Sequence, residues 1–124
     1  MARHGGAAAG HAGCRAGHAA PTHLTIEQSI VALGPVAFVP FPFEIFSEIT
    51  LRLREFSPYQ HTLCLSNANG SYFYFVSQDQ ICRGGYEVWV FKSMNVHSLA
   101  DDADNAIVKE NGRLLDALYA GTKR

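Results

Sequence analysis

Residues 36–46 read VAFVPFPFEIF, and this apolar stretch decides how the first half of the chain folds. Residues 36–41 are apolar, with β-branched and aromatic side chains, which is typical of a short strand. A Gly34-Pro35 turn separates this strand from residues 24–33, which are also rich in β-branched and apolar side chains. The two segments therefore predict a β-hairpin. Pro42 then suits the first position of a helix, because proline lacks the N–H group that this position leaves unpaired.

The predicted helix runs from Pro42 to about Phe56, where Ser57-Pro58 ends it, because a residue before proline is driven out of helical geometry. Apolar residues at helical spacing give this helix one buried stripe, made of Phe46, Ile49, Leu53 and Phe56. Residues 60–65 predict a further strand. One face of this strand consists of His61, Leu63 and Leu65.

The second half of the chain begins with residues 67–83, which are loop-like but contain the aromatic run 72–75, so part of this segment should be buried. After a Gly84-Gly85 turn, residues 86–91 predict a fourth strand. Ser98 and Asp101 have capping-box spacing, which predicts a last helix. Its apolar stripe is Ala103, Ile107, Leu114 and Leu118, and the acidic residues that suit its first turn are Asp101, Asp102 and Asp104. The sequence thus predicts an α+β (mixed α/β) fold, a small sheet of about three or four strands with two main helices, in the order β-β-α-β-(β)-α.

Residues 1–23 differ from the rest, because they are mostly Ala, Gly and His and contain no Leu, Ile, Val or Phe. Such a segment buries too little apolar surface to offset its ordering entropy, and it lacks the apolar centre of a secretory signal. We therefore expect a flexible leader followed by one domain over residues 24–124. An adventitious metal-binding role remains open for the leader's evenly spaced histidines, His4, His11 and His18.

The composition of the 124 residues excludes several classes of protein. Ten basic and 11 acidic residues give a formal net charge of -1, which argues against a nucleic-acid binder. No apolar run approaches the roughly 18 residues of a transmembrane helix. Three cysteines (14, 64 and 82) at no metal-ligand spacing argue against a disulfide framework and favour a reducing, cytoplasmic location. Cys64 lies in an apolar strand and is expected to be an inert buried thiol.

Few residues stand out as candidates for chemistry. Glu44 falls in the first turn of the predicted helix, where backbone N–H groups stabilise a carboxylate, so it is either a metal ligand or a helix-stabilising acid. Tyr72 and Tyr74 share one side of an extended segment, and Tyr86 follows a flexible turn; core packing and a plain turn are the competing interpretations. The chain contains none of the common hydrolase, protease or nucleotide-binding motifs, so no catalytic residue is assigned.

The order of these motifs resembles the neutral/alkaline (non-lysosomal) ceramidase family. Residues 39–49 read VPFPFEIFSEI and precede LRLR at 51–54; Ser66-Asn67 and Asn69-Gly70 precede the aromatic run, and residues 84–88 read GGYEV. The resemblance covers residues 24–118 and corresponds to the C-terminal part of that family's catalytic domain. The chain departs from the family at Phe43, where a glycine is usual, and at Val76-Ser77, where many members have Pro-Thr.

The resemblance implies a zinc-dependent amide hydrolase that acts on N-acyl sphingolipids. In that family two His, one Glu and one Tyr hold the zinc. Glu44 matches the glutamate and Tyr74 the tyrosine, with Tyr72 as the second choice, while Asn69 and Tyr86 are expected to line the site. The upstream segments that carry the two His ligands have no counterpart in this sequence, and the family is often secreted.

The resemblance therefore leads us to expect a hydrolase fragment that is inactive alone and is completed by an upstream chain. The alternative is a small non-catalytic interaction module, which forms homo-oligomers. A segment of a larger domain exposes apolar surface that its missing neighbours would cover, so we also expect self-association; the candidates for that surface are Phe41, Phe43, Phe73 and Phe75. Because oxygens that share a zinc ion lie roughly 3–4 Å apart, Glu44 and Tyr74 should face one cleft, with Tyr72 elsewhere or at its edge.

Overall fold

The structure is a computed structural model that describes residues 23–93 and 99–122. The α+β class predicted from the sequence is confirmed, because a three-stranded sheet, β1-β2-β4, and a two-stranded sheet, β3-β5, pack with helices. The elements are β1 (Val31–Leu33), β2 (Val36–Pro40), β3 (Glu44–Ile45), α1 (Ser47–Phe56), β4 (His61–Leu65), β5 (Tyr74–Phe75), α2 (Gln78–Arg83), α3 (Tyr86–Ser93) and α4 (Ala103–Thr122).

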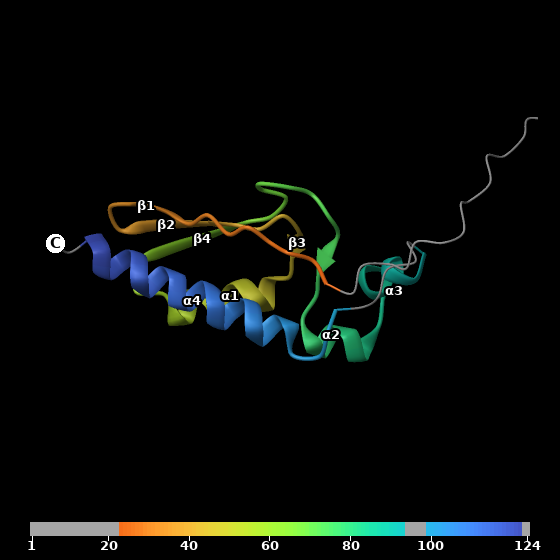
Figure 1. Ribbon diagram of the computed structural model, residues 1–124. Coiled ribbons are helices and arrows are strands. Elements are labelled where there is room, and N and C mark those ends of the chain that lie inside the picture. Colours follow the sequence, from red (N-terminus) through yellow and green to blue (C-terminus); the bar gives the residue numbers. More distant parts are fainter. Residues whose placement is uncertain (1–22, 94–98, 123–124) are drawn as a thin grey trace, which may run out of the picture.

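The predicted hairpin is present. β1 and β2 are antiparallel, and Gly34 adopts a φ of 56° in the turn between them. β2 then pairs in parallel with β4, with Val36 opposite His61, and α1 lies in the connection between the two strands. Such a crossover is what a parallel pair requires. Figure 1 shows β1, β2 and β4 in one layer, with α1 and α4 on the same side of it.

The hydrophobic core lies between this layer and the two helices. The sheet contributes Ala37 and Val39, which are fully buried, and the helices contribute Ile49, Leu53, Val108 and Leu115. A second part of the core is aromatic, with the rings of Phe43 and Phe75 5.2 Å apart and Phe41 buried nearby. Phe41, Phe43 and Phe75 are each at most 5% exposed, so the prediction that they form an exposed surface is wrong. Phe73 packs against the core and is partly buried.

Helix α1 begins at Ser47 and not at Pro42, because long-range hydrogen bonds hold the preceding residues in an extended form. The Phe41 N–H donates to the Leu65 carbonyl at 2.8 Å, and the Pro42 carbonyl accepts from the Tyr72 N–H at 2.9 Å. Of the predicted stripe, Ile49 and Leu53 are buried and Phe46 is half-buried. Phe56 is 66% exposed, so its predicted burial is wrong.

The segment 86–91 is helical and belongs to α3, so the predicted fourth strand is wrong. The helix starts at the Gly85 carbonyl, which accepts hydrogen bonds from the N–H groups of Val88 and Trp89 at 3.2 and 2.9 Å. The predicted burial within 67–83 is confirmed at Phe75 and Val76. This segment also contains β5 and the short helix α2, whose N-cap Ser77 hydroxyl accepts from the Gln80 N–H at 3.4 Å.

The predicted last helix is present as α4, which begins at Ala103; Ser98 lies outside the described residues. Asp104 is buried, so it does more than complement the helix dipole. The centre of the buried stripe is Asp104, Val108, Asn111 and Leu115, while the predicted positions Ala103, Ile107, Leu114 and Leu118 are partly buried beside it.

The leader predicted for residues 1–23 falls almost entirely outside the described residues. Among the helices of the described part, none has the length and apolar character needed to cross a membrane.

Candidate functional site

Strands β3 and β5 place Glu44 and Tyr74 directly opposite each other. The two strands are parallel, with Glu44 paired to Tyr74 and Ile45 paired to Phe75. The Glu44 N–H donates to the Phe73 carbonyl and the Phe46 N–H to the Phe75 carbonyl, both at 3.1 Å. Because paired residues of neighbouring strands project to the same face, the two side chains lie side by side.

The Tyr74 hydroxyl lies close enough to the Glu44 carboxylate for the negative charge to act on it. Desolvation raises the pKa of Tyr74 above 10.0, the charge of Glu44 and then the neighbouring Tyr86 raise it further, and Glu87 makes the smallest contribution. A negative neighbour disfavours a phenolate, so Tyr74 keeps its proton at neutral pH. The pair is therefore a neutral phenol beside a carboxylate.

The pair opens into a pocket of about 460 Å³, lined by Glu44, Ile45, Phe46, Ser47, Ser66, Asn67, Tyr74 and Glu87. Ser66, directly after β4, accepts a hydrogen bond on its Oγ from the Ile45 N–H at 3.2 Å, which ties the end of β4 to β3. Glu87 reaches the pocket from α3 and supplies a second carboxylate. The pocket therefore combines acidic and hydroxyl oxygens, the donor types that bind cations.

The other predicted site residues lie at different distances from this pocket. The Tyr86 ring packs edge-on against Tyr74, with centroids 6.1 Å apart. Asn69 and Tyr72 line a separate hollow with Pro42 and residues of the segment 25–29. The ring centroids of Tyr72 and Phe43 are 5.7 Å apart. Tyr74, and not Tyr72, thus shares a pocket with Glu44, as the expected cleft geometry requires.

Glu44 is not in a first helical turn, so a helix dipole does not explain its position. It lies in β3, and the acidic residue in the first turn of α1 is Glu48. Sequence reasoning did not assign Ser66, Asn67 or Glu87 to the site. The available signals were the position of Ser66-Asn67 directly after a strand and that of Glu87 beside Tyr86.

Within residues 23–93 and 99–122, no group of three or more His, Cys, Asp or Glu side chains is arranged to hold a metal ion. Structural and catalytic zinc sites use three or four protein ligands. Glu44 and Tyr74 provide two oxygens, so this pair does not make a zinc site by itself.

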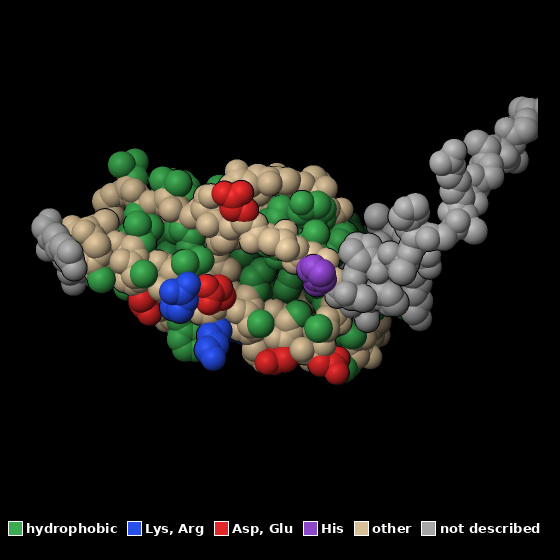
Figure 2. All heavy atoms as spheres, in the orientation of Figure 1, with side chains coloured by type: hydrophobic (Ala, Val, Ile, Leu, Met, Phe, Trp, Pro, Cys, Tyr) green, Lys and Arg blue, Asp and Glu red, His purple; other side chains and the backbone are tan. Residues whose placement is uncertain are grey.

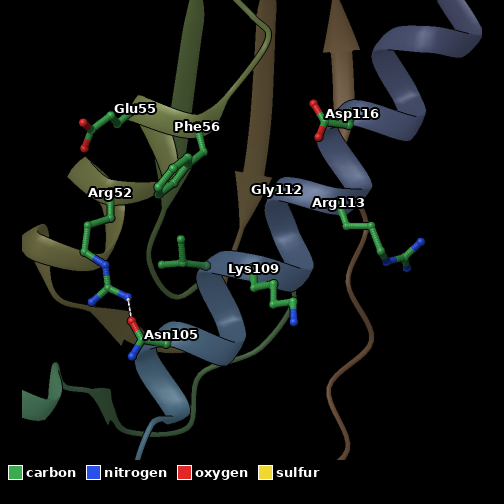
Figure 3. Close-up of a pocket in the computed structure, with 9 residues that line it drawn as sticks. Arg52, Glu55, Phe56, Asn105, Lys109, Gly112, Arg113 and Asp116 are labelled. Atoms are coloured by element: carbon green, nitrogen blue, oxygen red, sulfur yellow. Dashed lines mark hydrogen bonds between the residues drawn. The ribbon is translucent and has the colours of Figure 1, made fainter.

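A second cavity, of about 730 Å³, is the groove between α1 and α4 (Figure 3). Arg52 crosses it and donates to the Asn105 Oδ1 atom at 2.6 Å. Gly112 leaves open space in the groove, and the exposed ring of Phe56 lies on the side of α1. The charged groups that line it are of both signs: Arg52, Glu55, Lys109, Arg113 and Asp116. Because charges of both signs line the groove, its electrostatics favour neither an anionic nor a cationic ligand.

Comparisons of the chain with protein-family models, with curated proteins and with solved structures found no match.

Proposed function

We propose that this chain is a segment of a zinc-dependent amide hydrolase that resembles the neutral ceramidases, and that it contributes Glu44 and Tyr74 to a metal site. Its substrates are N-acyl sphingolipids and its location is the cytoplasm. The chain alone does not hydrolyse amides, because it supplies two of the family's four ligands. A polypeptide that carries the family's His motifs completes the site.

The observation that carries this proposal is the contact between Glu44 and Tyr74. The two residues are distant in sequence, and the family resemblance singles out both. They are paired across β3 and β5, the charge of Glu44 acts on the Tyr74 hydroxyl, and both residues line one pocket. A simple core-packing role does not account for a carboxylate and a phenol that meet at an open pocket.

The test is a zinc titration of the full chain in which the ultraviolet absorbance of tyrosinate is the readout. Absorbance of tyrosinate reports on tyrosine alone, so zinc held by the histidines of residues 1–22 would not change it. Zinc next to Tyr74 should stabilise the phenolate and lower its pKa, so absorbance appears at lower pH. Tyr74→Phe and Glu44→Gln should each abolish this change.

Tyr72→Phe is the matched control, because Tyr72 is exposed and lies in a different hollow. If the zinc-induced absorbance persists in Tyr74→Phe, the pair is not a zinc half-site. A fluorescent ceramide analogue should remain intact with the isolated chain and zinc. Hydrolysis that disappears in Glu44→Gln would show that the chain is a complete enzyme and would overturn the half-site.

The alternative, a non-catalytic interaction module, is favoured by one separate observation. One face of the β1-β2-β4 sheet is apolar and exposed, with Leu33 74% and Val31 60% exposed. Such a surface is typical of a contact with another polypeptide.

A further inference from the structure

The two faces of the β1-β2-β4 sheet have different surroundings. The inner face is packed against the core and consists of Ala32, Ala37, Val39, Thr62 and Cys64. The residues that alternate with these project to the opposite side. We name this set the outer face; it consists of Val31, Leu33, Val36, Phe38, Pro40, His61, Leu63 and Leu65.

The outer face is apolar, contiguous and open to solvent. Strand register sets Val31, Phe38 and Leu63 in one row and Leu33, Val36 and His61 in the next. The largest exposed fractions are those of Leu33 (74%), Val31 (60%), Leu65 (41%) and Leu63 (40%). The face contains no Lys, Arg, Asp or Glu, and His61 is its one titratable residue.

No described element covers this surface. Helices α1 and α4 lie on the other side of the strands (Figure 1), and apolar side chains gather at the surface around β1 (Figure 2). Parallel strands such as β2 and β4 are normally covered on both faces. Residues 1–22 contain no large apolar side chain except Met1, residues 94–98 read MNVHS, and residues 123–124 are Lys and Arg, so the composition of these three segments is not typical of an apolar cover.

We propose that the outer face is the contact surface between two copies of this chain, which pack sheet against sheet as a two-fold dimer. An uncharged apolar face is self-complementary, since a two-fold axis brings no like charges together. Two sheets pack about 10 Å apart when their side chains interdigitate, and Phe38 on the central strand is the largest side chain available for this. The dimer has four layers: helices, sheet, sheet and helices. This inference goes beyond the proposed function and does not depend on Glu44 or Tyr74.

The size of the outer face sets the expected strength of the dimer. Strands β2 and β4 have five residues each and β1 has three; at about 3.3 Å per residue and about 4.8 Å between strands they form a patch with a planar area of roughly 200 Å². A stable interface usually buries about 800 Å² per partner, so this dimer should be weak and in rapid exchange with the monomer.

Sedimentation equilibrium of the full chain, from about 10 μM to about 1 mM, tests the proposal in this affinity range. A reducing agent is present, because Cys82 is exposed and free. The average mass should rise from 13.6 kDa toward twice that value. Leu33→Asp and Leu63→Asp should each shift the midpoint of dimerisation to an at least tenfold higher protein concentration, because each substitution buries a carboxylate in the contact.

Leu51→Asp is the matched control, since Leu51 is 59% exposed on α1, away from the outer face. This variant should dimerise like the unaltered chain. A chain that stays monomeric at all concentrations overturns the proposal and leaves the outer face to a different polypeptide. Equal dimerisation of Leu33→Asp, Leu63→Asp and Leu51→Asp also overturns it, because the contact is then elsewhere.

A second measurement needs no variant and remains decisive if an aspartate substitution disturbs folding. Hydroxyl-radical footprinting of the unaltered chain should show that Phe38, Leu63 and Leu65 lose reactivity as concentration rises. Leu51 and Phe56, which are exposed on α1, should keep their reactivity. Protection of Leu51 and Phe56 instead would contradict the sheet-to-sheet contact.

Discussion

The carboxylate of Asp104 joins three helices of the fold. It accepts hydrogen bonds from the Arg52 guanidinium of α1 at 2.8 Å, from the Gln78 N–H of α2 at 3.2 Å and from the Asn105 N–H at 2.9 Å. Asp104 is 5% exposed. A buried carboxylate is tolerated when its oxygens are satisfied in this way.

We predict that Asp104→Ala destabilises the protein by about 2 kcal/mol, because the Arg52 Nη1 group and the Gln78 N–H lose their acceptor. Urea denaturation measures the difference. The control is Asp116→Ala, an exposed position on the same helix, which should change stability by less than about 0.5 kcal/mol. Equal effects of the two substitutions would show that Asp104 does not hold the helices together.

The same contacts predict a pH dependence. Burial on its own raises the pKa of Asp104, but the hydrogen bonds from Arg52, Gln78 and Asn105 outweigh it and hold the pKa below 3.8. A depressed pKa means that the stabilisation is fully present above pH 3.8 and is lost as the pH falls through the folded-state value. The stability difference between the unaltered chain and Asp104→Asn should therefore be constant from about pH 5 to 8 and shrink below about pH 4. A difference that grows on acidification would contradict this assignment.

At the scale of the element, the loop between β4 and β5 depends on one glycine. Gly70 has a φ of 151°, and a Cβ atom placed on it would lie 2.8 Å from the Pro42 Cβ. Pro42 is buried and its ring cannot rotate away.

Gly70→Ala should therefore cost about 1–3 kcal/mol in unfolding free energy. Gly112→Ala is the matched control, because Gly112 lies inside α4 with open space where a Cβ would be. The control should gain about 0.5–1 kcal/mol from helix propensity. Thermal unfolding of both variants decides the matter, and a neutral Gly70→Ala would mean that the loop relaxes without strain.

The elements that were predictable from the sequence are those fixed by local patterns. The Gly34-Pro35 turn specifies the β1–β2 hairpin, the alternation of residues 61–65 specifies β4, and helical spacing specifies α4. The start of α1 was not predictable, since it depends on two long-range hydrogen bonds, one from the Phe41 N–H to the Leu65 carbonyl and one from the Tyr72 N–H to the Pro42 carbonyl. Residues 86–91 have strand-forming side chains, but they form a helix whose first hydrogen bonds are accepted by the Gly85 carbonyl. The strand propensity of single residues is weaker than the influence of the surrounding structure.

The candidate site was predictable only in part, for the same reason. The resemblance paired Glu44 with Tyr74, and their proximity is observed, but their role as metal ligands stays a prediction. Glu87 was missed because it reaches the pocket from α3, which the sequence predicted as a strand.

At the scale of the whole molecule, stability should reside in residues 23–124. Residues 1–22 contain no Leu, Ile, Val, Phe, Tyr or Trp, so they can add little buried apolar area. Deletion of these residues should leave the thermal midpoint nearly unchanged. Calorimetry of the shortened and full chains makes the comparison, and a decrease of several degrees would show that the segment packs on the domain.

The shortness of β3 and β5 has a consequence for the dynamics of the protein. Each strand has two residues, whereas β2 and β4 pair over five. Short strands at the margin of a fold open with a smaller free energy than its central sheet. Native-state hydrogen exchange should therefore show the amides of Glu44 and Phe46 exchanging through a local opening, while those of β2 and β4 exchange near the global unfolding limit. Glu44 and Tyr74 would then separate and rejoin many times before the whole molecule unfolds once. Any ligand that bridges them would stabilise the closed form and slow hydrogen exchange at these amides.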